Sequence, residues 1–178
     1  ILLVPHFGCW EITGRVLSID TPVTFLYKPL RKASQEALLI KNRQKQSLSM
    51  ATADKKGVIK LQRAIKNKEL IGILPDQDPG EEGGVLAPFF GTNARSMTLL
   101  AKLARKNNAK VLLTWALRLP KGAGFEIHLE PVNILSEQGT VKEDVALMNK
   151  VIESLVKTQP EQYLWNYKRF KSVVDYSS

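Results

Sequence analysis

The sequence predicts an α/β fold, in which helices flank a layered β-sheet of mixed strand direction. Short apolar runs alternate with helical patterns over the first half of the chain, which is typical of parallel strands joined by helices. Two strand-like runs then follow each other directly between residues 111 and 131, and adjacent strands of this kind pair antiparallel. At 178 residues and 44% hydrophobic, the chain is long enough for one sizeable core, so we expect a single domain over residues 1–178.

Apolar runs that stop at proline define the strands of the first half. Ile1 to Val4 is apolar and ends at Pro5, which cannot donate to a β-ladder, so it predicts a short buried strand. Gly8 permits a sharp turn before the helical pattern that follows. The expected elements are, in order, a strand over residues 1–4, a helix from Cys9 or Trp10, a strand over 22–27, a helix over about 33–46, an amphipathic helix after Gly57 and a strand over 70–74.

The second half opens with a long loop that is rich in glycine, proline and acids, over residues 76–84, and long loops of this kind tend to be functional. Phe89 and Phe90 look like exposed aromatics within it. The remaining expected elements are a helix capped by Ser96 and stopped at Asn107–Asn108, strands over 111–119 and 125–130, a helix over about 143–157 and a last helical piece over 161–170, whose aromatic side chains favour core packing.

The net charge of +9 is concentrated in one stretch. From Lys28 to Glu69 the chain has twelve lysines and arginines against three acids, and the rest of the chain is neutral. This predicts an anionic partner: a phosphorylated lipid, an anionic membrane surface, an acidic protein or nucleic acid. The alternative is a set of lysine-rich helices whose charges serve only solubility.

Several classes of site are excluded by inspection. One cysteine cannot form an internal disulfide, and two histidines make a zinc cluster improbable. The chain has no phosphate-binding loop, no dinucleotide fingerprint and no serine nucleophile elbow. We therefore expect neither a metal nor an organic cofactor. No window has the ~20 apolar residues of a membrane span, and because the chain opens inside an apolar strand without methionine, we expect an N-terminal segment, with any membrane anchor, to lie upstream.

His6 and Glu11 are the candidate catalytic pair. On one continuous helix, residues five apart point about 140° away from each other, but His6 on the turn before the helix could meet Glu11 in its first turn. Glu11 could then accept a proton-bearing ring nitrogen and leave the other nitrogen as a base, with backbone N–H groups near Gly8 as candidate oxyanion donors. The alternative is a helix-capping histidine beside a solvated carboxylate. We expect Cys9 to pack and His128 to lie on the surface.

Several blocks, in this order, resemble one family. His6-Phe7-Gly8-Cys9-Trp10-Glu11 is similar to the H-x4-D/E signature of glycerolipid acyltransferases, and the whole chain resembles the lipid A biosynthesis late acyltransferases of Gram-negative bacteria, the lauroyl and myristoyl transferases. The other matching blocks are Tyr27-Lys28-Pro29, Arg43 at the position of an essential arginine, Pro75-Asp76-Gln77-Asp78, Phe89-Phe90-Gly91, and Pro160 to Trp165 followed by Lys168-Arg169-Phe170.

The resemblance implies a glycerolipid acyltransferase-like fold and transfer of a fatty acyl chain from acyl carrier protein to a hydroxyl of a phosphorylated lipid A precursor. It places the reaction at the cytoplasmic face of the bacterial inner membrane, where the basic stretch suits an anionic surface. His6 would be the general base, oriented by Glu11. Arg43 would bind phosphate or the acceptor, and Asp76 would lie behind the pair or contact the acceptor. Without the resemblance, Arg43 is one surface cation among many and Asp76 a turn residue.

Two alternatives stay open at this point. A phospholipid acyltransferase would act on glycerol phosphate or lysophosphatidate, but the chain has no F-x-x-R or E-G-T-R block of that branch. A basic nucleic-acid-binding module would explain the charge, yet it gives His6, Glu11 and the acidic loop no role, and no base-stacking motif accompanies the basic stretch. We therefore expect no nucleic acid as partner.

Overall fold

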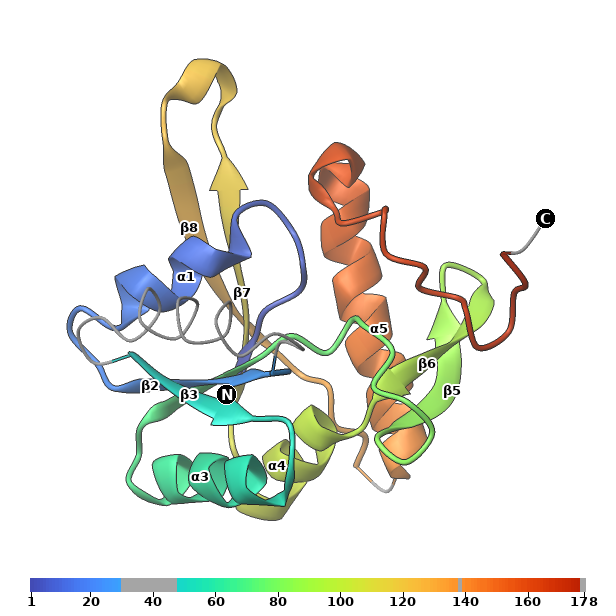
Figure 1. Ribbon diagram of the computed structural model, residues 1–178, viewed down its shortest axis with the longest axis horizontal. Helices are drawn as coiled ribbons and strands as arrows, with labels where there is room; N and C mark the ends of the chain where they lie inside the picture. The colour runs from blue at the N-terminus through green and yellow to red at the C-terminus, as the bar shows by residue number, and fades with distance from the viewer. Residues whose placement is uncertain (30–47, 138, 177–178) are drawn as a thin grey trace.

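The fold is built on a six-stranded mixed sheet, and helices lie on both of its faces (Figure 1). The computed structural model describes residues 1–29, 48–137 and 139–176. The strands lie in the order β3-β2-β4-β1-β7-β8, and only β8 runs antiparallel to its neighbour. Their bounds are β1 (Leu2–Leu3), β2 (Val23–Tyr27), β3 (Leu48–Thr52), β4 (Leu70–Ile73), β7 (Val111–Arg118) and β8 (Phe125–Val132). The predicted α/β class with mixed strand direction is confirmed.

The described helices begin and end where local chemistry favours it. They are α1 (Trp10–Leu17), α3 (Lys55–Lys66), α4 (Leu99–Asn107) and α5 (Val141–Thr158), with short 3-10 turns at Pro120–Gly122 and Pro160–Gln162. The Asp54 carboxylate caps α3 by accepting from the Gly57 N–H, and Thr140 with Glu143 forms a capping box at α5. Asn108 ends α4 in the left-handed conformation, at the predicted stop.

Two apolar cores form because successive side chains of a buried strand point to opposite faces of the sheet. Leu3 and Ile73 belong to the larger core, which also contains buried residues of α3, α4 and α5. Leu2, Val4 and Phe25 face the other way and pack with Trp10 and Leu17 of α1. Both faces of the central strands are therefore covered.

The structure differs from the expected elements in three places. First, strand β3 was not expected. Second, residues 84–97 form a hairpin of β5 (Gly84–Phe89) and β6 (Thr92–Met97), in which Phe89 is buried; Ser96 is a strand residue, and Thr98 precedes α4 in its place. Residues 161–170 are not a helix beyond the single turn at Pro160–Gln162, and Leu164 bonds back to the loop after β1. The helix expected over 33–46, and Arg43 within it, lie outside the described residues.

Within the described residues, no helix combines the length and apolar composition that crossing a bilayer requires.

Candidate active site

The parallel strands β1 and β4 place His6 beside Asp76. Their register pairs Leu3 with Ile73, and the Val4 N–H donates to the Ile73 carbonyl at 3.0 Å. His6 and Asp76 each follow three residues beyond that pair, after Pro5 and Pro75 respectively. The carboxyl ends of parallel strands meet at one sheet edge, which is where open α/β sheets bind their ligands.

Asp76 holds His6 by two hydrogen bonds. Nδ1 of His6 lies 2.8 Å from Oδ1 of Asp76, and the His6 backbone N–H donates to Oδ2 at 2.9 Å. Burial of Asp76, which is 2% exposed, would alone raise the pKa of the carboxyl, but the hydrogen bonds and charge of His6 outweigh burial and hold that pKa below its ordinary value of 3.8. An ionised Asp76 favours the tautomer with the proton on Nδ1, which leaves Nε2 as the basic nitrogen.

The carboxylate on Nδ1 is thus Asp76, whereas the sequence predicted that Glu11 would orient the ring. Glu11 lies in the first turn of α1 and lines the same pocket as His6. The difference has a topological cause, since β4 comes directly alongside β1 in the sheet although Asp76 follows His6 by 70 residues. Trp10, which lies between His6 and Glu11 in sequence, packs with its ring centre 5.1 Å from that of the imidazole.

The loop that carries His6 is fixed on both sides by backbone hydrogen bonds. The Gly8 N–H donates to the Gln162 carbonyl and the Cys9 N–H to the Ala116 carbonyl, each at 2.8 Å. Gly8 has φ +60, and a Cβ there would lie 2.0 Å from the Ala116 oxygen, so only glycine fits. The Gly8 and Cys9 N–H groups are thus bonded within the protein, and an oxyanion donor among the other N–H groups near Gly8 stays a prediction.

Two buried polar side chains, Tyr163 and Arg169, lie near Asp76. Burial, and then the adjacent Asp76 carboxylate, raise the pKa of Tyr163, so its phenol stays protonated. Arg169 is buried as well, donates to the Arg95 carbonyl and the Ser96 hydroxyl, and lies with its guanidinium 5.0 Å from the Phe89 ring centre. The pKa of Arg169 is lowered by burial, which the nearby Tyr163 and Asp76 oppose. The closing segment, residues 160–176, therefore lies against Asp76, where the sequence predicted only core packing.

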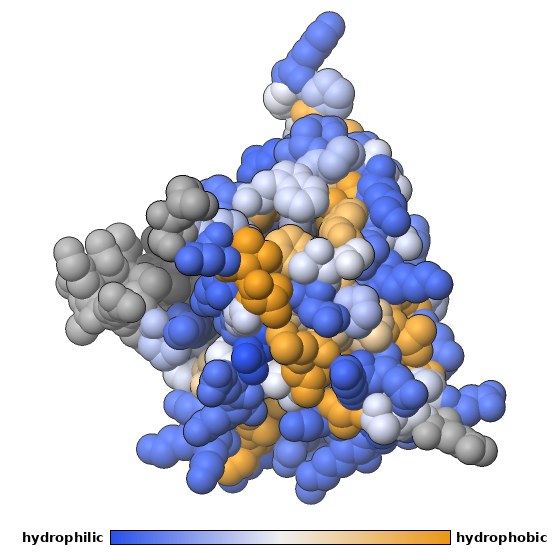
Figure 2. Space-filling view, turned by 90° about the vertical axis from the view of Figure 1, so that its right-hand side faces the viewer, coloured by the Kyte–Doolittle hydropathy of each residue, from blue (hydrophilic) through white to orange (hydrophobic). Residues whose placement is uncertain are grey.

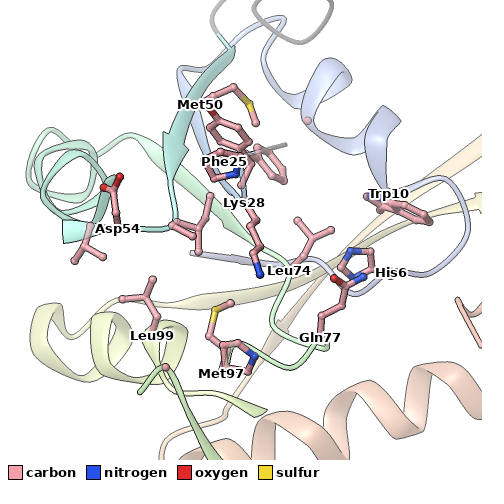
Figure 3. A pocket seen from close by; sticks show the side chains of 18 of the residues that line it. His6, Trp10, Phe25, Lys28, Met50, Asp54, Leu74, Gln77, Met97 and Leu99 are labelled. Carbon is pink, nitrogen blue, oxygen red and sulfur yellow. The ribbon is translucent and has the colours of Figure 1, made fainter. Parts of the chain in front are cut away.

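A cavity of about 920 Å³ opens beside His6, at the upper end of the range for small-molecule sites. Figure 3 shows His6 and Trp10 at one end and Asp54 toward the other, with the Lys28 amine reaching into the space between. Apolar side chains from the sheet, α1 and α4 line most of its length: Trp10, Phe25, Leu26, Leu48, Met50, Leu74, Met97 and Leu99. Among the described residues that line it, the cations are Arg15, Lys28 and Lys102.

The other candidates fall outside the site's chemistry. Cys9 is half-buried and precedes α1, while its N–H bonds to β7. His128 stacks on Trp115 at 4.6 Å and lies 3.4 Å from Glu126, on the outer strand β8. Among the residues the structure describes, no group of three histidine, cysteine or acidic side chains is arranged to hold a metal.

Fold and site together define an α/β protein with a buried-carboxylate–histidine pair at the mouth of a long apolar pocket. Comparison with known proteins shows the family: the chain belongs to the bacterial lipid A biosynthesis acyltransferases, whose family model matches residues 1–172. It is 31% identical over 175 residues to the lipid A biosynthesis lauroyltransferase of Escherichia coli K12, covering 97% of this chain and 56% of that protein.

Two further relatives agree. The Escherichia coli K12 lipid A biosynthesis palmitoleoyltransferase is 29% identical over 169 residues, 94% of this chain and 54% of that protein. A lipid A biosynthesis acyltransferase of Haemophilus influenzae is 30% identical over 166 residues, 93% of this chain and 51% of that protein. The chain thus spans about half the length of the curated relatives it matches. The family resemblance predicted from the motifs is confirmed.

Proposed function

We propose that this protein transfers a fatty acyl chain from acyl carrier protein to a hydroxyl of a phosphorylated lipid A precursor. The observation that supports it most is the pairing of His6 with ionised Asp76 beside a long apolar pocket, in a chain of the lipid A acyltransferase family. An acyl chain needs an apolar pocket, and a hydroxyl nucleophile needs a base. The described site offers both within one cavity.

The reaction follows from the tautomer that Asp76 favours. Nε2 of His6 takes the proton of the acceptor hydroxyl as its oxygen attacks the thioester carbonyl, so that a C–O bond forms. The C–S bond then breaks, and the proton passes from the imidazolium to the leaving thiolate. Asp76 stabilises the imidazolium while it carries that proton, and Tyr163, kept neutral, adds no competing negative charge.

The remaining pocket residues would bind and orient the two substrates. Glu11 lines the cavity, so we assign it two roles: contact with the acceptor and support of the His6 ring. Lys28 reaches into the cavity and suits a phosphate or the developing oxyanion, since the Gly8 and Cys9 N–H groups are bonded elsewhere. Arg43 remains our proposed phosphate-binding residue on the resemblance alone.

The setting proposed for this chemistry is the cytoplasmic face of the bacterial inner membrane. A lipid acceptor resides in a bilayer, and anionic lipids there attract basic protein surfaces. The excess of positive charge between Lys28 and Glu69 supports this location and an acidic donor protein.

The test is radiolabelled acyl transfer from acyl carrier protein to a lipid A precursor by the full-length protein. We expect His6→Ala to lower turnover by about 10²–10⁴-fold without unfolding the protein, since it removes the base. The conservative control is His128→Ala, which removes the other histidine and leaves turnover within about twofold. Transfer that does not depend on His6 contradicts the general base, and transfer only to glycerol phosphate or lysophosphatidate would assign the protein to phospholipid synthesis.

A further inference from the structure

Helix α3 presents an unusual outward face. Its twelve residues include five cations and no acid, while its inward face is formed by the buried Gly57, Leu61 and Ala64. The five cations, Lys55, Lys56, Lys60, Arg63 and Lys66, are all exposed. Among the described residues, none of them lies within ion-pair distance of a carboxylate. The Lys60 amine donates to the Met50 carbonyl at 2.8 Å, so the charges of the other four cations are the ones available to a partner.

An apolar side chain lies in the middle of this charged face. Ile59 is 50% exposed, and Lys55 and Arg63 lie one turn before and after it on the same side of the helix. An exposed isoleucine within a ring of cations resembles the centre of a protein interface, where an apolar contact is surrounded by charges that steer the partner. Simple solubility does not require it.

The face borders the pocket that leads to His6. Asp54 and Val58, from the N-terminal end of α3, line the cavity together with Lys102 of α4. In Figure 3 Asp54 lies at the end of the cavity away from His6. A partner seated on α3 would thus lie beside this cavity, and a flexible arm attached to that partner could carry a thioester toward the imidazole.

We infer that the outward face of α3 is the docking surface for the acidic carrier protein that delivers the acyl thioester. This inference rests on the proposed function, and it adds where the donor binds and by which contacts. Lys56 and Arg63 would pair with carboxylates of the carrier, and Ile59 would contact an apolar residue among them. Lys102, which lines the cavity, would attract the phosphate that links the prosthetic arm to the carrier.

An anionic bilayer fits α3 less well than an acidic protein. Helices that lie in a membrane interface bury a broad apolar face in the lipid, whereas the apolar face of α3 packs on the sheet and only Ile59 points outward. Exposed apolar side chains gather elsewhere, on β5, α5 and the closing segment: Leu86, Leu147, Trp165, Val173 and Val174. Figure 2 shows an apolar strip across the face that carries these elements.

The test compares two donors in steady-state transfer with the full-length enzyme. One donor is acyl carrier protein loaded with the acyl chain, and the other is the same chain on N-acetylcysteamine, which has no protein surface. For Lys56→Glu/Arg63→Glu we expect KM for the carrier-bound donor to rise about tenfold or more, and to rise less at high salt, while kcat/KM for the small donor changes less than twofold. The control, Lys142→Glu/Lys150→Glu on α5, makes the same change in net charge and leaves both donors unaffected.

Direct binding separates this inference from the proposed function. Titration of acyl carrier protein into the His6→Ala protein measures docking whether or not acyl transfer occurs, and we expect Lys56→Glu/Arg63→Glu and Ile59→Ala each to weaken it. Equal losses with both donors, or carrier binding that does not depend on α3, would overturn the inference. So would variants that bind the carrier normally but no longer bind vesicles of anionic phospholipid, which would assign α3 to the membrane.

Discussion

Asp76→Asn tests the orientation of His6 most directly. The wild-type carboxylate accepts two hydrogen bonds from His6, one from the backbone N–H and one from Nδ1. An asparagine has one oxygen and one NH₂, so it can accept only one of them with that oxygen. If the backbone N–H keeps the oxygen, the NH₂ faces Nδ1, and the imidazole must move its proton to Nε2 to accept from it. The basic nitrogen would then point away from the substrate.

The expected loss is large in turnover and small in substrate binding. Removing a correctly oriented general base costs about 10²–10⁴-fold, or ~2.7–5.4 kcal/mol at 1.36 kcal/mol per factor of ten. Because neither His6 nor Asp76 needs to touch the acyl chain, KM for the donor should change little, and the loss should appear in kcat. Glu11→Gln is the matched control: it removes a carboxylate that also lines the cavity but is not the one on Nδ1, so we expect a smaller effect on kcat.

The tautomer itself can be measured. In ¹⁵N-imidazole spectra, the signals that His6→Gln removes are those of His6. We expect wild-type His6 to show protonated Nδ1 at neutral pH and Asp76→Asn to show protonated Nε2. A wild-type ring protonated at Nε2, or an Asp76→Asn protein with unchanged tautomer and turnover, would refute the role of Asp76. If Glu11→Gln changed the tautomer instead, the orienting carboxylate would be Glu11.

Three further outcomes follow from the same structure and can be measured by denaturant unfolding. Gly8→Ala should destabilise the fold by at least ~2 kcal/mol, because φ is +60 and the new Cβ would lie 2.0 Å from the Ala116 oxygen; Gly80→Ala, with φ +87 but no atom within 4 Å, should cost less. Arg105→Ala should lower the unfolding midpoint, because it removes the 2.6 Å partner of the buried Asp144 carboxylate and leaves only the bonds from Ser136; Lys106→Ala is the neutral control. The free energy of unfolding should be complete above about pH 5 and fall as the pH drops through 4. The reason is that the pKa values of Asp76 and Asp144 lie below 3.8 in the folded state, because interactions with His6 (for Asp76) and with Arg105 and Ser136 (for Asp144) outweigh burial. An unfolding midpoint unchanged between pH 6 and pH 3 would contradict those assignments.

The strands that end at proline were predictable, and so was His6 at a strand end, yet its partner was not. Val4-Pro5-His6 and Leu74-Pro75-Asp76 share one pattern: a buried strand, a proline and an ionisable side chain. Had the two strands been known to be neighbours, the pattern would have paired His6 with Asp76. Strand order is set by packing across the whole sheet, and one sequence does not reveal it. The spacing of Glu11 was the nearest available signal.

The β5–β6 hairpin was hidden for a local reason. Its two-residue turn places Phe90 and Gly91 at positive φ, whereas asparagine or aspartate before glycine is the usual signal of that turn. β6 is polar and poor in β-branched residues, and Pro88 interrupts β5, so neither reads as a strand. Tertiary contacts overcome these weak propensities, because the aromatic ring of Phe89 is buried against Tyr163 and Phe170.

Hydrogen bonds from the closing segment of the chain fix the loop that carries His6. The His6 carbonyl accepts from the Leu164 N–H and the Gly8 N–H donates to the Gln162 carbonyl, so residues 162–164 act as a strand-like clamp on this loop. β1 has only two residues and cannot fix that loop by itself. Its position is instead fixed by three segments distant in sequence: β4 through Asp76, β7 through Ala116 and the clamp. The position of His6 therefore depends on segments distant in sequence, and if His6 is the proposed base, a change in the closing segment should lower kcat before it lowers stability.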